Sequence, residues 1–267
     1  MNWLQVAQGQ APLIIAIPHA GTNLQDVAGQ FVSSWLARHD TDWWIDELYA
    51  FAAELGATIL RTNVSRSVID VNRDPSGASL YPGQATTGLC PVTTFDGKPL
   101  YRLAEPSEGE IARRRAAWFD PYHARLEAEI TRLRGIHSRV VLYDAHSIRS
   151  RIPRLFASEL PQFNIGTNNG VTCDQALSTA IVDICHARGQ SFVLNGRFKG
   201  GWTTRNYGRP AAGIHAVQME LAIRGYLDEA SSIDETNWPP RFDPDRASPL
   251  QLILSDILKA CLAFAIH

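Results

Sequence analysis

The sequence is poor in cysteine, and its few thiols are not spaced for a cross-link or a metal site. Four cysteines lie far apart in 267 residues, with no CxxC among them, at positions Cys90, Cys173, Cys185 and Cys261. This spacing argues against a disulfide-rich scaffold and against a thiolate zinc site. We predict four reduced thiols that are mostly buried.

An excess of charge of one sign and long apolar runs are also missing. The chain has 25 lysines and arginines against 27 aspartates and glutamates, and its arginines are dispersed. Such a balance argues against a nucleic-acid or membrane surface. No apolar run approaches the roughly 20 residues of a membrane span, and the N-terminus lacks a signal-peptide pattern. We therefore expect a cytoplasmic protein whose partner is a small-molecule substrate.

Motifs of nucleotide binding and of two common hydrolase types are absent as well. The sequence has no GxGxxG or Walker-type loop, no GxSxG elbow and no HExxH. The sequence therefore contains none of the usual motifs for nucleotide binding or serine hydrolysis.

Apolar runs and amphipathic stretches alternate along the chain. Expected strands cover residues 12–17, 57–60, 67–71, 139–144, 191–194 and 214–220, and expected helices cover 40–55, 106–134, 174–188 and 249–264. Residues 72–100 are rich in turn formers and are expected to be irregular. This alternation predicts a single α/β domain over 1–267, with a mixed, largely parallel central sheet flanked by helices.

Two of the expected strands end in a histidine. His19 follows the apolar run 13–17, and His146 closes the run that begins at Val140. In open α/β sheets, ligands and catalytic groups gather at the carboxyl ends of the strands, so a shared metal site is expected there. A catalytic zinc site needs a third ligand, and the candidates are Asp42, Asp46 and Glu47. Asp144 is placed to orient a ligand or to cap its strand.

Further polar residues could take part in hydrolysis. Glu220 ends an apolar strand and either pairs with an arginine or acts as a general base beside a metal. His215, on the same strand, could donate a hydrogen bond to an oxyanion or only fill space. Arg73, Arg205 and Arg209 lie in turn-rich segments, where arginine commonly binds carboxylates, and they suggest a small dicarboxylic substrate.

Six segments, in order between about residues 12 and 228, resemble the N-formylglutamate amidohydrolase family. They are Pro18–Gly21, Asp40–Tyr49, Asp70–Gly77, Asp144–Ser147, Thr203–Pro210 and Gln218–Leu221. The resemblance implies a fold similar to that of zinc-dependent exopeptidases (phosphorylase/hydrolase-like). It also implies hydrolysis of N-formyl-L-glutamate to L-glutamate and formate, a step of histidine degradation.

The same resemblance implies roles for individual residues. His19, Asp42 and His146 would bind Zn²⁺ or another divalent ion, with Asp46 as the alternative third ligand, and Glu220 would be the base. The Asn72-Arg73 pair is similar to the pair with which zinc carboxypeptidases hold a terminal carboxylate, and Arg205 would assist it.

Two other functions are compatible with these residues. A zinc amidase acting on another N-acyl amino acid, or on the cell wall, would use the same chemistry, and a substrate panel separates it. A non-catalytic binding protein for a small carboxylate would keep the arginines without a working metal site. A chelator distinguishes this alternative, because it abolishes hydrolysis and leaves plain carboxylate binding intact.

Overall fold

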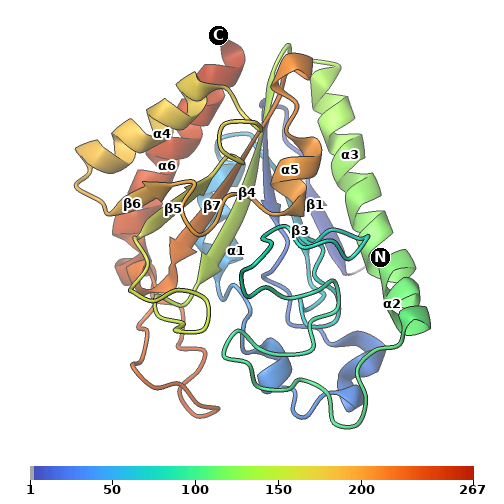
Figure 1. The fold of residues 1–267 in the computed structure, drawn as a ribbon. Coiled ribbons are helices and arrows are strands. Elements are labelled where there is room, and N and C mark those ends of the chain that lie inside the picture. The colour runs from blue at the N-terminus through green and yellow to red at the C-terminus, as the bar shows by residue number, and fades with distance from the viewer. Residues whose placement is uncertain (1–2) are drawn as a thin grey trace.

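The computed structural model describes residues 3–267, which form a seven-stranded sheet with helices on both faces (Figure 1). The strands are β1 (Leu4–Ala7), β2 (Leu13–Ile17), β3 (Thr58–Thr62), β4 (Val140–Ile148), β5 (Phe163–Gly166), β6 (Phe192–Leu194) and β7 (Ile214–Ala222). Their order is β1-β3-β2-β4-β7-β5-β6. Only β1–β3 and β5–β7 pair antiparallel among the paired strands of the described residues. The predicted α/β class with a mixed, largely parallel sheet is confirmed.

The centre of the sheet is apolar on both faces. Every residue of β2 is buried, and its side chains alternate between two cores. Ile15 packs with Tyr143 of β4 in one core, and Ile14 packs with Leu142 in the other. Continuous apolar runs are thus explained by burial on both sides of the sheet.

Helices cover the two cores. On one face lie α2 (Glu108–Arg114) and α3 (Asp120–Arg134), which a π-helical turn joins, and on the other lie α4 (Gln175–Ala187) and α6 (Pro244–Ile266) (Figure 1). Ser107 is the N-cap of α2, since its Oγ accepts from the Glu110 backbone N–H at 3.3 Å. The short α5 (Trp202–Tyr207) contacts β4 and β7.

Two local predictions are wrong, and two short strands were not predicted. The expected helix 40–55 is reduced to α1 (Ile45–Leu48) and a 3₁₀ turn at Ala50–Ala53, and Trp44 precedes α1 in the left-handed region with φ of 60°. Residues 67–71 form turns instead of a strand, because the backbone there bends to bring polar groups inward. The short strands β1 and β5 were not expected. The irregular segment 72–100 has no helix or named strand, as predicted.

All four cysteines are buried and free, as predicted. The helix α6 is long and apolar enough to cross a membrane by length and composition, which the sequence did not lead us to expect. Its inner face, however, supplies Leu254, Ile257 and Leu258 to the core, and its Asp256 pairs with Arg188 after α4. In this fold α6 acts as a core helix.

Truncation of the inner face of α6 should therefore destabilise the protein. Leu254 is fully buried, so Leu254→Ala is expected to lower the free energy of unfolding by about 2–5 kcal/mol. Leu252 is 62% exposed on the same helix, and Leu252→Ala should change it by less than about 0.5 kcal/mol. Denaturant unfolding of both variants measures this. Equal effects would contradict the packing described for α6.

Candidate metal centre

The carboxyl ends of the parallel strands carry the two histidines predicted to share a site. His19 follows β2 by two residues, and His146 lies near the end of β4, the strand beside β2. Both side chains are about 2% exposed, and their ring centroids are 4.8 Å apart. Neighbouring parallel strands thus place side chains separated by more than a hundred residues at one point.

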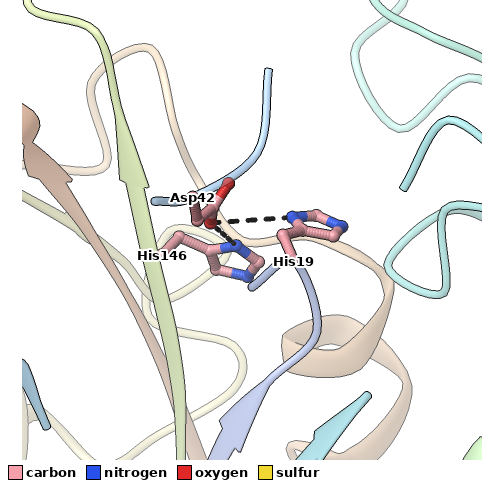
Figure 2. A group of neighbouring side chains, drawn as sticks. All are labelled: His19, Asp42 and His146. Carbon is pink, nitrogen blue, oxygen red and sulfur yellow. Dashed lines mark hydrogen bonds and ion pairs between the residues drawn. The ribbon is translucent and has the colours of Figure 1, made fainter. Parts of the chain in front are cut away.

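Asp42 lies beside both rings, and a dashed line joins its carboxylate to each of them in Figure 2. Its Oδ2 is 3.2 Å from His146 Nδ1 and 3.8 Å from His19 Nδ1. A backbone hydrogen bond of 3.1 Å from Asp42 N to His19 O fixes the loop that carries it. The three ligand atoms all lie within 4.8 Å of one another, so the His19, Asp42 and His146 side chains could hold one metal ion. Asp46, the alternative third ligand, instead pairs with Arg61.

The other ring nitrogens contact carboxylates. His19 Nε2 is 2.7 Å from Asp70 Oδ1, and His146 Nε2 is 3.0 Å from Asp144 Oδ1. Carboxylates in this position orient metal-binding histidines and strengthen them as ligands. His19 Nδ1, in contrast, is buried without a hydrogen-bond partner and faces Asp42. A buried polar atom left unpaired is costly, and a metal ion at this point would satisfy it. The residues present therefore fit a divalent metal.

The buried charges compensate one another through Arg66. Its Nη1 donates to Asp42 Oδ1 at 3.2 Å and its Nη2 to Asp70 Oδ2 at 2.9 Å. Burial alone would raise the pKa of Asp70, but Arg73, His19 and Arg66 hold it well below its ordinary value. Burial lowers the pKa of His19 to about 4, so this ring is neutral near pH 7. Burial opposes the charged form of His146 too, but Asp144 and Asp42 raise its pKa.

Glu220 faces the histidine cluster from β7. It is the register partner of His146, and Gln218 Nε2 donates to its Oε2 at 3.0 Å. Its side chain is 7% exposed, and burial raises its pKa to about 7. A carboxylate with a pKa near neutrality can both take and return a proton at working pH. No arginine pairs with Glu220 in the described residues, so the ion-pair alternative has no support.

Asn72 joins the cluster to α5. Its Nδ2 is 2.8 Å from His146 Nε2 and 3.1 Å from Asp144 Oδ2, and its Oδ1 accepts from the Thr203 N–H at 2.8 Å. Gly201 leaves room for it, since a Cβ there would lie 2.5 Å from Asn72 Nδ2. Asn72 therefore links the histidine cluster to α5, and the substrate-binding role expected of it stays a prediction.

A pocket opens beside His19, His146 and Glu220, and arginines line it. Arg73 is one of them, as the sequence suggested, and it is held by Thr87 through hydrogen bonds of 3.1 and 3.3 Å. Arg205 does not line this pocket and lies over the Tyr81 ring at 5.0 Å. Arg209 is exposed and bonds Asn206 O. The structure therefore gives no support to the predicted binding roles of Arg205 and Arg209.

His215 lies at the opposite end of β7 from Glu220. It packs edge-on against Phe264 at 4.7 Å, and its Nδ1 accepts from the Asp174 N–H at 3.1 Å. Five residues of strand span roughly 16 Å and reverse the side-chain direction. The prediction that His215 stabilises an oxyanion is therefore wrong.

Three residues of the site were missed: Asp70, Arg66 and Arg197. Asp70 lies in the segment 67–71 that was wrongly expected to be a strand, and Arg66 directly precedes it. The β-branched residues of that segment gave no reason to expect paired charges. Arg197 lies in a glycine- and arginine-rich stretch, and its composition was the only available signal.

Together, the fold and the site define an α/β protein with a candidate metal centre at the carboxyl edge of its sheet, a buried carboxylate beside it and an arginine-lined pocket. Comparison with known proteins makes this class specific. The chain belongs to the N-formylglutamate amidohydrolase family, whose family model matches residues 11–227.

Curated relatives match nearly the whole chain. An N-formylglutamate deformylase of Pseudomonas putida is 46% identical and one of Pseudomonas aeruginosa is 44% identical, each covering 98% of this chain and 96% of the relative. The crystal structure of N-formylglutamate amidohydrolase from Ralstonia eutropha JMP134 is similar to this fold, with a TM-score of 0.79 and 24% identity. The match covers 99% of this chain and 97% of the Ralstonia eutropha chain.

Metal content of purified variants tests the three ligands. His19→Ala and Asp42→Ala are expected to lose bound zinc after dialysis, because each removes one of three converging ligand atoms. Asp46→Ala and His186→Ala are matched controls, since Asp46 pairs with Arg61 and His186 is exposed on α4. Elemental analysis gives the stoichiometry. Zinc loss from Asp46→Ala but not from Asp42→Ala would reverse the assignment.

Proposed function

We propose that this protein hydrolyses N-formyl-L-glutamate to L-glutamate and formate, acts in the cytoplasm and uses a zinc ion held by His19, Asp42 and His146. The observation that carries the proposal is the buried carboxylate of Glu220 opposite the His–Asp–His cluster, in a pocket lined by arginines. The names of the relatives, both N-formylglutamate deformylases at 44–46% identity, supply the substrate.

The donor set suits zinc. Two imidazoles and one carboxylate leave a coordination position open, which is the arrangement of catalytic zinc sites. A divalent ion bound there would polarise the formyl carbonyl and lower the pKa of its water from 15.7 toward about 7. His19 is neutral near pH 7 and is therefore ready to bind a cation without first releasing a proton.

Glu220 performs the proton transfers. As a carboxylate it takes a proton from the attacking water, whose oxygen bonds to the formyl carbon. It then returns this proton to the amide nitrogen as the C–N bond breaks, which releases formate and the amine of glutamate. The hydrogen bond from Gln218 to Oε2 orients Glu220 and leaves Oε1 for this work. A pKa near 7 suits both steps.

Arg73 binds and orients the substrate. It follows Asn72, which contacts His146, so its guanidinium lies at the wall of the pocket next to the metal ligands. The hydrogen bonds to Thr87 and Asn72 O fix its fork in place. A carboxylate close to the scissile amide would bind there, which excludes neutral formamides.

Formate release should depend on the metal. Purified protein is expected to release formate from N-formyl-L-glutamate, to lose this activity after chelation and to regain it when zinc is added. A coupled formate assay with parallel metal analysis measures both quantities. No release from fully zinc-loaded protein would reject the proposed substrate, and undiminished release from metal-free protein would reject the proposed chemistry.

Removal of the base should slow the reaction without removing the metal. Glu220→Gln keeps the shape of the side chain and is expected to lower kcat by about 10²–10⁴-fold, the usual contribution of a general base. Glu235→Gln, at an exposed position, is the control. Steady-state kinetics and metal content are measured together. Wild-type kcat in a zinc-loaded Glu220→Gln variant would remove Glu220 from the mechanism.

A further inference from the structure

The three arginines of the pocket differ in how their charges are compensated. Arg66 lies between Asp42 and Asp70, and Arg73 Nη2 is 3.6 Å from Asp70 Oδ2. Arg197 has no carboxylate within 4 Å in residues 3–267. It is therefore the pocket arginine whose charge the described protein leaves without an ion-pair partner.

Arg197 is nevertheless held firmly. Its Nε donates to Leu155 O at 3.1 Å and its Nη2 to Ala85 O at 2.7 Å. Its guanidinium carbon lies 5.3 Å from the centroid of the Tyr81 ring and 5.5 Å from that of Phe198. Neutral carbonyls and rings orient the guanidinium without neutralising it. Burial lowers the pKa of Arg197, and the charge of Arg73 lowers it further.

One guanidinium nitrogen remains free for a ligand. Nη1 of Arg197 makes no hydrogen bond to any residue in 3–267, and it is not buried from solvent. Because Nε and Nη2 are already engaged, Nη1 is the part of the fork that can bind an anion in the pocket. Two like charges, Arg73 and Arg197, line the same pocket, which favours a ligand with more than one negative group.

The two arginines have different anchors. Arg73 follows Asn72, whose side chain touches His146, whereas Arg197 is fixed by Ala85, Leu155 and Tyr81 in irregular segments of the chain. In N-formyl-L-glutamate, the α-carboxylate is on the carbon that bears the scissile nitrogen. The side-chain carboxylate is two methylene groups farther away.

We propose that Arg197 binds the side-chain carboxylate of the substrate while Arg73 binds the α-carboxylate. Arg197 is then the residue by which the pocket selects an acidic side chain over a neutral one. The assignment rests on the proposed function, since it takes N-formyl-L-glutamate as substrate.

The test compares N-formyl-L-glutamate with N-formyl-L-glutamine, which has nearly the same shape and no side-chain charge. Arg197→Met is expected to lower kcat/KM for the glutamate substrate by about 10- to 100-fold, the loss of one charge-assisted hydrogen bond. Its kcat/KM for the glutamine substrate should change little. Arg197→Lys keeps the charge and should recover part of the preference for the glutamate substrate. It loses the guanidinium hydrogen bonds to Leu155 O and Ala85 O.

Arg139→Met is the matched control. Arg139 also lies over an aromatic ring, Phe264 at 5.2 Å, and donates to its backbone carbonyl, but it does not line the pocket. It should keep the wild-type preference. An equal loss of kcat/KM for both substrates in Arg197→Met, or an unchanged ratio, would overturn the assignment, because a purely structural role affects both substrates alike.

A binding measurement separates this inference from the proposed reaction. Calorimetry on zinc-loaded protein should show tighter binding of L-glutamate than of L-glutamine, and Arg197→Met should remove the difference. If the wild type releases no formate but shows this Arg197-dependent preference, the reaction is wrong and the carboxylate site stands. The assignment fails, whatever the formate-releasing activity, in either of two cases. The first is equal binding of L-glutamate and L-glutamine by the wild type, and the second is a wild-type preference for L-glutamate that Arg197→Met keeps.

Discussion

The compensation of buried charge at the carboxyl edge of the sheet is the constraint on which the rest of the site depends. Three carboxylates, from Asp42, Asp70 and Asp144, lie almost fully buried among two imidazoles and the Arg66 guanidinium. Such charges persist in an interior only when they are paired and hydrogen-bonded. The segments that carry them are therefore fixed relative to the sheet, and so are the candidate ligand atoms of His19, Asp42 and His146.

Sequence patterns predicted the central strands because the burial of each strand is visible in its own run of residues. The apolar runs of β2, β4 and β7 are long enough to stand out, and the end of an apolar run shows where polar side chains emerge at the sheet edge. The same periodicity separates His215 from Glu220. His215 and Glu220 are five residues apart, an odd number, so their side chains leave opposite faces of the strand.

The remaining parts of the site depend on partners that no local pattern reveals. Asp70 and Arg66 acquire their roles from His19 and Asp42, which are distant in sequence. Part of the pocket wall is irregular backbone, and Arg197 joins two of these irregular segments through the carbonyls of Ala85 and Leu155. Loop conformation of this kind is set by tertiary contacts, so the sequence identified Arg73 but neither found Arg197 nor excluded Arg205 and Arg209.

The strand order across the sheet has a consequence for folding. β2 pairs with β4, and β4 pairs with β7, so neighbours at the centre of the sheet come from widely separated parts of the chain. Pairings this distant in sequence close large loops and form slowly compared with local contacts. His19 and Asp42 are synthesised early, whereas Glu220 and Arg197 follow late. A nascent chain therefore contains the early polar residues of the site before it contains the late ones. The complete site, and with it the capacity for hydrolysis, forms only when β7 joins the sheet.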